Sequence, residues 1–267
     1  MNATRSHDNL LAFTLIELLV VVAILSVLLA ILLPALQGVR SLAYRSRCMG
    51  HLRSIAIGWI TYAEDNRGTF LLLGVGANPE FEFGGWPGDG YAKYRPLNPY
   101  VQLGLDANSA SETEARVFRC PADTGDEDYP VPYYKELGNS YRANTALGCS
   151  GGVSESIKEP WRTINREINS RFQGLLCTNV PDTTTMLLVG DYNWLTQIDP
   201  MWTMCAKSWH GQRHRYNLAF LDGHAGDIRI RKGIYFEQGT YRWQPFKSID
   251  DTVLALQKPV PCRCGQP

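Results

Sequence analysis

The sequence has no excess of charge of either sign. Its 26 lysine and arginine residues are balanced by 26 aspartate and glutamate residues, so the formal net charge is zero. Nucleic-acid partners are bound through an excess of positive charge, and this composition predicts none. The sequence also lacks a P-loop and a dinucleotide fingerprint. The glycine-rich residues 148–152 lack the lysine of a phosphate-binding loop, so we interpret them as an ordinary loop.

Cysteine is too scarce for a disulfide scaffold in a chain of 267 residues, yet frequent for a reducing compartment. An exported chain would form one to three disulfides and leave at least one thiol. Cys262 and Cys264 are too close in sequence to pair with each other, and no second pair at zinc-finger spacing accompanies them, so we reject zinc there. The seven cysteines are Cys48, Cys120, Cys149, Cys177, Cys205, Cys262 and Cys264.

A long apolar run follows a polar leader, residues 1–12, which carries Arg5 and His7. About 20 residues from Phe13 precede Pro34, enough to cross a hydrocarbon core of about 30 Å. A signal peptide is the alternative. The run is too long for one, no A-x-A cleavage site follows it, and Glu17 interrupts its start.

Helical periodicity continues beyond this run. Apolar residues recur at spacings of three and four, as on one face of an amphipathic helix. With Gly68 as a C-terminal cap, one helix is predicted from Phe13 to Asn66, on the order of 80 Å long. The residues of the apolar face are Leu36, Val39, Leu42, Ala43, Met49, Leu52, Ile55, Ala56, Trp59, Ile60 and Ala63.

Glu17 is the most unusual residue of the apolar run. An ionised Asp, Lys or Arg at the bilayer centre costs roughly 2.5–3.5 kcal/mol, and Glu is comparable. An isolated buried carboxylate would neutralise by raising its pKa. Cleavage between Ala12 and Phe13 would create an ammonium group to pair with it. The alternative is that Glu17 reaches the membrane interface.

Residues 12–19, Ala-Phe-Thr-Leu-Ile-Glu-Leu-Leu, resemble the prepilin processing signature of type IV pilins and type II secretion pseudopilins. Pro34, twenty-one positions after Phe13, matches a helix-kinking proline frequent in that family. Ala12 departs from the family's usual glycine. Residues 116–123 and 140–144 resemble recurring segments of pseudopilin-like proteins with an extended C-terminal domain.

The resemblance implies a filament subunit. A prepilin peptidase would cleave after Ala12 and N-methylate Phe13. Subunits would then bundle their apolar helices, with Glu17, Thr14 and Pro34 as assembly residues and other pilin or pseudopilin subunits as partners. No cofactor, metal ligand or catalytic residue is expected.

The implied fold is pilin-like α+β: a long N-terminal helix, half of it transmembrane, packed on an antiparallel sheet with a loop-rich C-terminal region. We expect a leader at 1–12, a transmembrane and assembly helix at 13–34, its amphipathic continuation at 35–67 and an extracytoplasmic globular domain at 68–267. The chain would cross the inner (cytoplasmic) membrane once. The positive-inside rule predicts the opposite orientation. Four arginines follow the span and only Arg5 precedes it, which favours a cytoplasmic C-terminal domain. We give the processing signature more weight.

A β-hairpin is the clearest feature of the C-terminal region. Residues 216–221 and 224–231 flank Asp222-Gly223, a strong tight-turn signal. In the second strand Ile228 and Ile230 alternate with arginines, which predicts an outer strand with one wet face. Residues 185–191 predict a short buried strand running into a turn.

Two other functions remain as alternatives on the same anchor. His210, His214, Asp222 and His224 could hold a metal ion in an extracytoplasmic enzyme, although no glutamate base follows the histidines. A purely structural hairpin is the favoured explanation of these residues. A loop stabilised by a cation bound to Asp191, Asp199 or Asp222 ranks second, ahead of the enzyme. The resembled family often has a histidine, then nine residues, then Asp-Gly. Here eleven residues separate His210 from Asp222 and seven separate His214 from Asp222, so neither histidine matches this spacing. The second alternative is a glycan-binding adhesin using exposed tryptophans, Trp86, Trp194 or Trp202.

Overall fold

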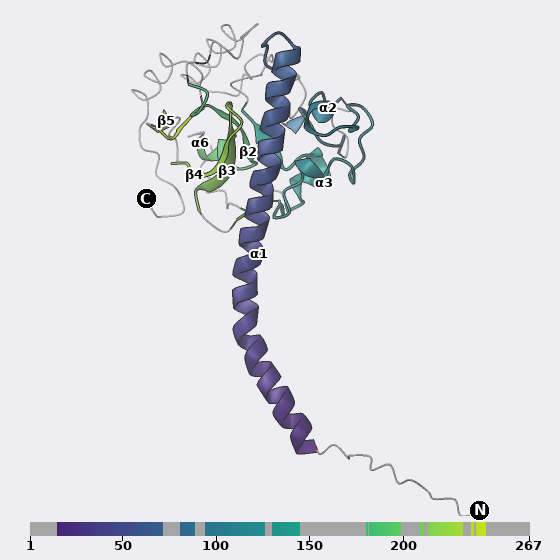
Figure 1. The fold of residues 1–267 in the computed structure, drawn as a ribbon, viewed down its shortest axis with the longest axis vertical. Helices are drawn as coiled ribbons and strands as arrows, with labels where there is room; N and C mark the ends of the chain where they lie inside the picture. Colours follow the sequence, from purple (N-terminus) through teal and green to yellow (C-terminus); the bar gives the residue numbers. More distant parts are fainter. Residues whose placement is uncertain are drawn as a thin grey trace, which may run out of the picture. The chain divides into compact units, whose positions relative to one another are not determined.

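The computed structural model describes residues 15–71, 81–88, 94–125, 130–144, 180, 182–198, 209–210, 213–231, 236–237 and 239–243. Ala12, Phe13 and Thr14 lie outside these ranges, as do five of the seven cysteines. The chain divides into two compact units, Met1–Leu42 and Ala43–Pro267, and helix α1 (Leu15–Asp65) belongs to both (Figure 1).

In the first unit, α1 carries apolar side chains on all sides from Leu18 to Leu36, apart from Ser26. Every side chain from residue 15 to residue 42 is exposed, including an almost continuous series of Leu, Ile and Val. At 1.5 Å per residue, residues 15–33 extend about 28 Å, close to the thickness of a hydrocarbon core. The hydroxyl of Ser26 donates to the carbonyl of Val22 (2.7 Å), which satisfies this polar group within the helix. Among the described residues, α1 is the one helix long and apolar enough to span a membrane.

In the second unit, α1 buries one face: Cys48, Leu52, Ile55, Ala56, Gly58, Trp59 and Ala63. The predicted apolar face is confirmed from Leu52 onward. Leu36, Val39 and Leu42 are exposed instead, so the packed face begins near Cys48. The helix ends at Asp65, where the amide of Gly68 donates to the carbonyl of Ala63 (2.7 Å), as in a Schellman motif. The predicted end is confirmed, although the left-handed conformation begins one residue earlier, at Arg67 (φ 59°).

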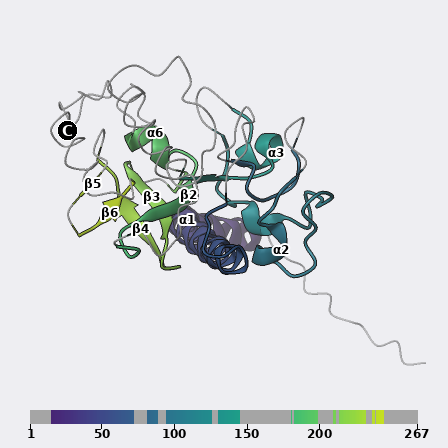
Figure 2. The ribbon, with the colours of Figure 1, turned by 90° about the horizontal axis from the view of Figure 1, so that it is seen from above.

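Four antiparallel strands form the main sheet in the order β1 (Tyr141–Ala143), β2 (Leu187–Asp191), β3 (Arg215–Phe220) and β4 (Ala225–Arg229) (Figure 2). The β3–β4 hairpin and the fully buried β2 confirm the sequence predictions. β4 is an edge strand, as expected, and is followed by the buried Ile230, with Arg229 exposed. β5 (Phe236–Glu237) and β6 (Tyr241–Arg242) form a second, two-stranded antiparallel sheet.

The second-unit part of α1 lies between the main sheet and a loop-rich segment that carries α2 (Asn98–Val101) and α3 (Tyr133–Leu137) (Figures 1 and 2). Leu52 and Trp59 of α1 share one hydrophobic core with Leu188 of β2 and Leu218 of β3. The described chain is therefore α+β, with a long N-terminal apolar helix and a four-stranded antiparallel sheet.

A buried arginine organises the loop-rich segment. Arg95 is fully buried, and its guanidinium donates to the carbonyls of Phe81 (2.6 Å), Leu137 (2.9 Å) and Pro87 (3.2 Å). Burial lowers its pKa to about 10, so it stays charged at neutral pH. One cation thus satisfies two carbonyl groups of the segment 81–88 and one at the end of α3, which holds irregular backbone in place without a sheet ladder.

Candidate functional site

The processing segment itself falls outside the described residues, since Ala12, Phe13 and Thr14 are not among them. Glu17 is exposed in the first described turn of α1, and Pro34 lies inside the helix. An exposed apolar surface of this size is not stable in water, so it requires lipid or other apolar helices around it. Residues 15–42 are therefore one candidate functional surface.

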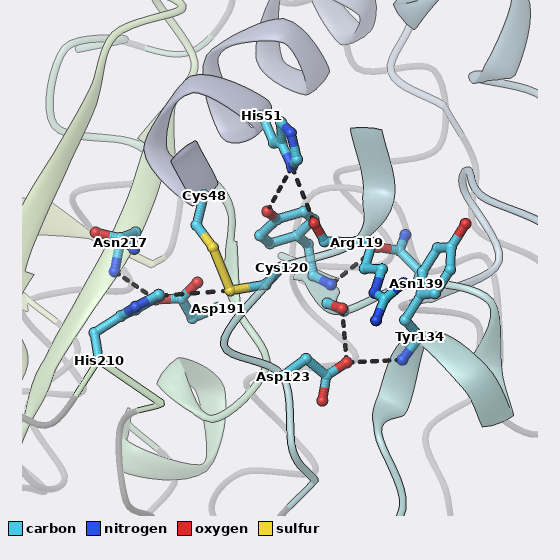
Figure 3. Close-up of a disulfide and its surroundings, with 12 residues drawn as sticks. Cys48, His51, Arg119, Cys120, Asp123, Tyr134, Asn139, Asp191, His210 and Asn217 are labelled. Carbon is cyan, nitrogen blue, oxygen red and sulfur yellow. Dashed lines mark hydrogen bonds and ion pairs between the residues drawn. A yellow bond between two sulfur atoms is a disulfide. The ribbon is translucent and has the colours of Figure 1, made fainter. Parts of the chain in front are cut away.

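The second candidate is a buried cluster formed by Cys48, Cys120, His210 and Asp191, which we call the Cys–His cluster (Figure 3). Cys48 belongs to α1, and Cys120 follows the 3₁₀ turn η2 (Arg116–Phe118). The two cysteines form a disulfide across 72 residues of sequence, with their Cα atoms 5.2 Å apart. Ligand atoms of Cys48, Cys120 and His210 all lie within 4.8 Å of one another.

His210 faces both the disulfide and a carboxylate. Its Nε2 atom lies 3.6 Å from Cys120 Sγ and 3.5 Å from Asp191 Oδ2. A cysteine-protease relay uses one imidazole nitrogen for the sulfur and the other for the carboxylate. Here both groups approach the same nitrogen, so the cluster lacks that geometry. Nucleophilic catalysis by Cys120 is also incompatible with its disulfide bond.

Asp191 ends the buried strand β2, where the residue is 3% exposed. Its Oδ2 atom accepts the backbone N–H of Asn217 in β3 (2.8 Å). Its Oδ1 atom receives no hydrogen bond from the described residues. A buried carboxylate oxygen without a donor is costly, which makes this position a candidate for a bound cation or a water molecule.

The carboxylate of Asp123 fixes the loop around Cys120. Asp123 accepts N–H groups from Tyr133 (3.0 Å) and Tyr134 (2.8 Å) and the hydroxyl of Ser140 (2.6 Å). The carboxylate thus supplies the acceptor for the N-terminus of α3 that Pro132 cannot provide. Burial nevertheless raises the pKa of Asp123. Residues 116–123 and 140–144, the two segments singled out in the sequence, contact each other here.

His51 ties α1 to the same loop. Its Nδ1–H donates to the carbonyl of Arg119 (3.0 Å), and Nδ1 lies 3.3 Å from the hydroxyl oxygen of Tyr141 in β1. Burial lowers the pKa of His51, so the folded state favours the neutral imidazole. Burial also raises the pKa of Tyr141. α1, the Cys120 loop and β1 are therefore joined by a disulfide and by polar contacts.

The histidines singled out in the sequence do not form one metal site. His214 Nδ1 contacts Gln197 Nε2 (2.8 Å), and His224 Nδ1 contacts Asp222 Oδ1 (2.6 Å) in the exposed turn of the β3–β4 hairpin. His210 faces Asp191 instead. Within the described part of the chain, no His, Cys, Asp or Glu group suited to a metal contains His214, Asp222 or His224. The four-residue metal alternative is therefore wrong, and Asp199 lies outside the described residues.

The tryptophan alternative also fails at Trp194. This side chain is fully buried, and its indole N–H donates to the carbonyl of Arg142 (3.0 Å). Trp86 is partly buried, and its indole N–H donates to the carbonyl of Tyr134 (2.8 Å). Trp202 lies outside the described residues. Trp86 and Trp194 are therefore used in packing, as aromatic residues in loop-rich folds commonly are.

Sequence reasoning did not find the Cys–His cluster. Cys48 lies four residues before Leu52, on the packed face of α1, and this spacing was an available signal. Cys120 follows the buried Phe118 by two residues. His210 and Asp191 carried no such signal, because both residues are far from Cys48 and Cys120 in the sequence and meet them only in the folded chain.

No family model matches this chain, and neither a curated protein nor a solved structure is similar enough to it to count as a match.

Proposed function

We propose that this chain is a structural subunit of a pseudopilus or type IV pilus-like filament of a type II secretion-like system, processed by a prepilin peptidase. The observation that carries the proposal is the apolar helix of residues 15–42, exposed on all sides and carrying a carboxylate, Glu17, in its first described turn. The prepilin-like residues 12–19 add the cleavage site to this helix.

Glu17 provides the register of assembly in this proposal. Cleavage after Ala12 leaves the ammonium of Phe13 one helical turn before Glu17. In an apolar bundle the carboxylate gains from such a partner only when both charges are present and aligned, because an unpaired charge pays the full cost of desolvation. Phe13 of the same or a neighbouring subunit can supply the charge. Thr14 and Pro34 complete the assembly segment.

The second unit suits a head that stays folded while its helix is held in a filament. The Cys48–Cys120 disulfide links α1 to the loop-rich segment, and Asp227 of β4 forms ion pairs with Arg45 of α1 and Arg215 of β3. These links connect α1 to the head through covalent and ionic contacts in addition to apolar packing.

The disulfide also supports an extracytoplasmic position for the head, because disulfides persist in oxidising compartments. This agrees with cleavage on the cytoplasmic side of a single-pass inner-membrane segment. It opposes the orientation that the arginines after the span favour. The proposed partners are other pilin or pseudopilin subunits, the peptidase and the membrane. The proposed function includes no catalysis.

The test is the intact mass and N-terminal sequence of the protein purified from membranes that contain a prepilin peptidase. The expected mature chain begins at N-methylated Phe13. An Ala12→Gly chain restores the family's usual residue and is expected to be processed faster, whereas Ala12→Leu is expected to stay uncleaved. A wild-type chain that retains Met1, or one cut beyond Leu33, would overturn the proposal.

A further inference from the structure

We propose that the Cys–His cluster is a Zn²⁺ site when Cys48 and Cys120 are reduced, and that the disulfide and the metal are alternative ways of closing the same site. This inference goes beyond the filament role and does not depend on it. It rests on the chemistry of the four side chains, the distances between them and their burial.

The donor set is that of a zinc site. Zinc is bound by thiolate sulfur, imidazole nitrogen and carboxylate oxygen, with four ligands in tetrahedral sites. Cys48, Cys120 and His210 are all buried, and one ligand atom of each lies within 4.8 Å of the others. Asp191 adjoins His210 and offers an oxygen as the fourth ligand.

The distances from His210 to Cys120 and to Asp191 match edges of a zinc tetrahedron. Ligand atoms bound at about 2.0–2.3 Å in tetrahedral geometry are separated from one another by roughly 3.3–3.8 Å. His210 Nε2 lies 3.6 Å from Cys120 Sγ and 3.5 Å from Asp191 Oδ2. Two of the three edges that meet at His210 thus already have the required length. Reduction of their bond allows Cys48 and Cys120 to separate, and the Asp191 oxygen, which is not within 4.8 Å of every other ligand atom, must move toward the sulfurs.

Charge and burial favour the metal once the thiols are reduced. Two thiolates neutralise the two charges of Zn²⁺, so binding the ion adds no net charge to the buried site, where the Asp191 carboxylate already lies. Asp191 Oδ1 is buried and has no donor among the described residues, so the described N–H groups leave acceptor capacity unused in this region. A cation satisfies such an oxygen directly.

Replacement of the disulfide by bound Zn²⁺ takes two steps. A small dithiol reduces the disulfide, giving two cysteine thiols and the oxidised dithiol. Zn²⁺ then binds both sulfurs and releases their two protons. Because Cys48 and Cys120 are 0% and 1% exposed, the ion enters while the reduced chain folds rather than through the folded surface. The site would thus hold the two sulfurs together before oxidation.

The test uses the full chain in detergent with its five other cysteines changed: Cys149→Ser, Cys177→Ser, Cys205→Ser, Cys262→Ser and Cys264→Ser. The chain is refolded with excess dithiol and Zn²⁺ or Co²⁺, then freed of unbound metal. The expected result is one metal ion per chain, with thiolate-to-cobalt charge-transfer absorption and the visible bands of tetrahedral Co²⁺. The oxidised chain is expected to bind none at this site.

Two variants separate this site from other histidines. His210→Gln is expected to lower the affinity for Zn²⁺ at least tenfold, as loss of a ligand does, whereas His224→Gln in the exposed hairpin turn leaves it unchanged. X-ray absorption of the zinc-loaded parent is expected to show two sulfur ligands, together with nitrogen and oxygen. This measurement needs no further variant, so it shows whether the two sulfurs bind the metal even if His210→Gln does not fold. A folded, reduced parent that binds no metal, or binds it without sulfur, would overturn the proposal.

Discussion

Gly58 of α1 lies against Val101 of α2 with no room for a side chain between them. A Cβ atom at Gly58 would approach Val101 Cγ2 to 2.6 Å and the backbone of Tyr100 and Val101 to 3.1 Å. The approach explains why a glycine stands on the buried face of a helix, where it otherwise lowers stability.

Gly58→Ala is therefore expected to lower the free energy of unfolding by about 1–3 kcal/mol, the usual range for overpacking. Gly50→Ala, on the same helix and with nothing within 4 Å of its Cβ position, is the matched control. That change is expected to raise the free energy of unfolding by up to about 1 kcal/mol, through helix propensity. Denaturant unfolding of the full chain in detergent measures both. Stabilisation by both changes would contradict the close packing.

Removing the disulfide is expected to destabilise the second unit. A Cys48→Ala, Cys120→Ala double variant opens a cross-link spanning 72 residues. The expected loss is about 2–5 kcal/mol, because the unfolded chain regains the entropy of that loop. Unfolding should be measured with and without a dithiol, in the presence of a chelator. The dithiol should destabilise the wild-type chain more than the variant; an equal effect on both would show that this disulfide contributes nothing.

Asp227 joins two cations, and its charge is expected to matter for stability. Its carboxylate pairs with Arg45 of α1 and with Arg215 of β3 and is 12% exposed. Desolvation, followed by repulsion from Arg215, lowers the pKa of Arg45. Asp227→Asn leaves the two arginines without the carboxylate between them, and a loss of about 1–3 kcal/mol is expected.

Asp222→Asn is the control for this charge, because Asp222 is 30% exposed and pairs with His224 in a surface turn. An exposed pair of this kind contributes about 0–1 kcal/mol. Thermal unfolding of the two variants side by side is the measurement. The role assigned to Asp227 would be wrong if its variant were no less stable than that of Asp222.

The lowered pKa of His51 predicts that the free energy of unfolding depends on pH. Burial lowers its pKa in the folded state below the unperturbed 6.5. Below pH 6.5 the unfolded chain therefore binds more protons at this residue than the folded chain does. The free energy of unfolding thus has its full value above 6.5 and decreases as the pH falls through the folded pKa.

His51→Asn retains an N–H donor for the carbonyl of Arg119 but cannot titrate. The variant is expected to lose less stability than the wild type between pH 6.5 and pH 5, whatever its stability at neutral pH. Denaturant midpoints across this range compare the two chains. Parallel pH profiles would show that His51 does not contribute to the acid sensitivity.

For the proposed filament subunit, Glu17→Ala is expected to leave membrane insertion intact and to lower incorporation into filaments, because the proposed ammonium of Phe13 would lose its partner. Glu17→Gln keeps the size and polarity of the side chain and removes the charge, so it should fail in the same way. Membrane fractionation measures insertion, and co-purification with sheared filaments measures incorporation. Normal incorporation of Glu17→Gln would show that charge pairing does not set the register.

Local patterns decided much of what the sequence predicted. The end of α1 near Gly68, the β3–β4 hairpin around Asp222-Gly223, the buried β2 and the edge position of β4 all follow from periodicity, turn residues and alternation over a few neighbouring residues. The length of the apolar part of α1 follows in the same way, since its side chains form one continuous apolar run in the sequence.

Side chains that meet across the fold could not be assigned in this way. Both Trp194 and His224 fit more than one role in the sequence, and only packing placed Trp194 in the core and His224 beside Asp222 in a turn. The packed face of α1 also begins later than its periodicity predicts, near Cys48, because periodicity shows which residues share a face but not what covers it.

The sequence by itself determined the long apolar helix with one acid near its start, which is long enough to span a membrane. The tertiary structure alone decided that Cys48 pairs with Cys120 and that His210 and Asp191 lie beside them. The physical reason is that helices, turns and strands depend on contacts between near neighbours in the chain. A buried cluster depends on how α1, the loop after η2 and the β2–β3 pair pack around a common core.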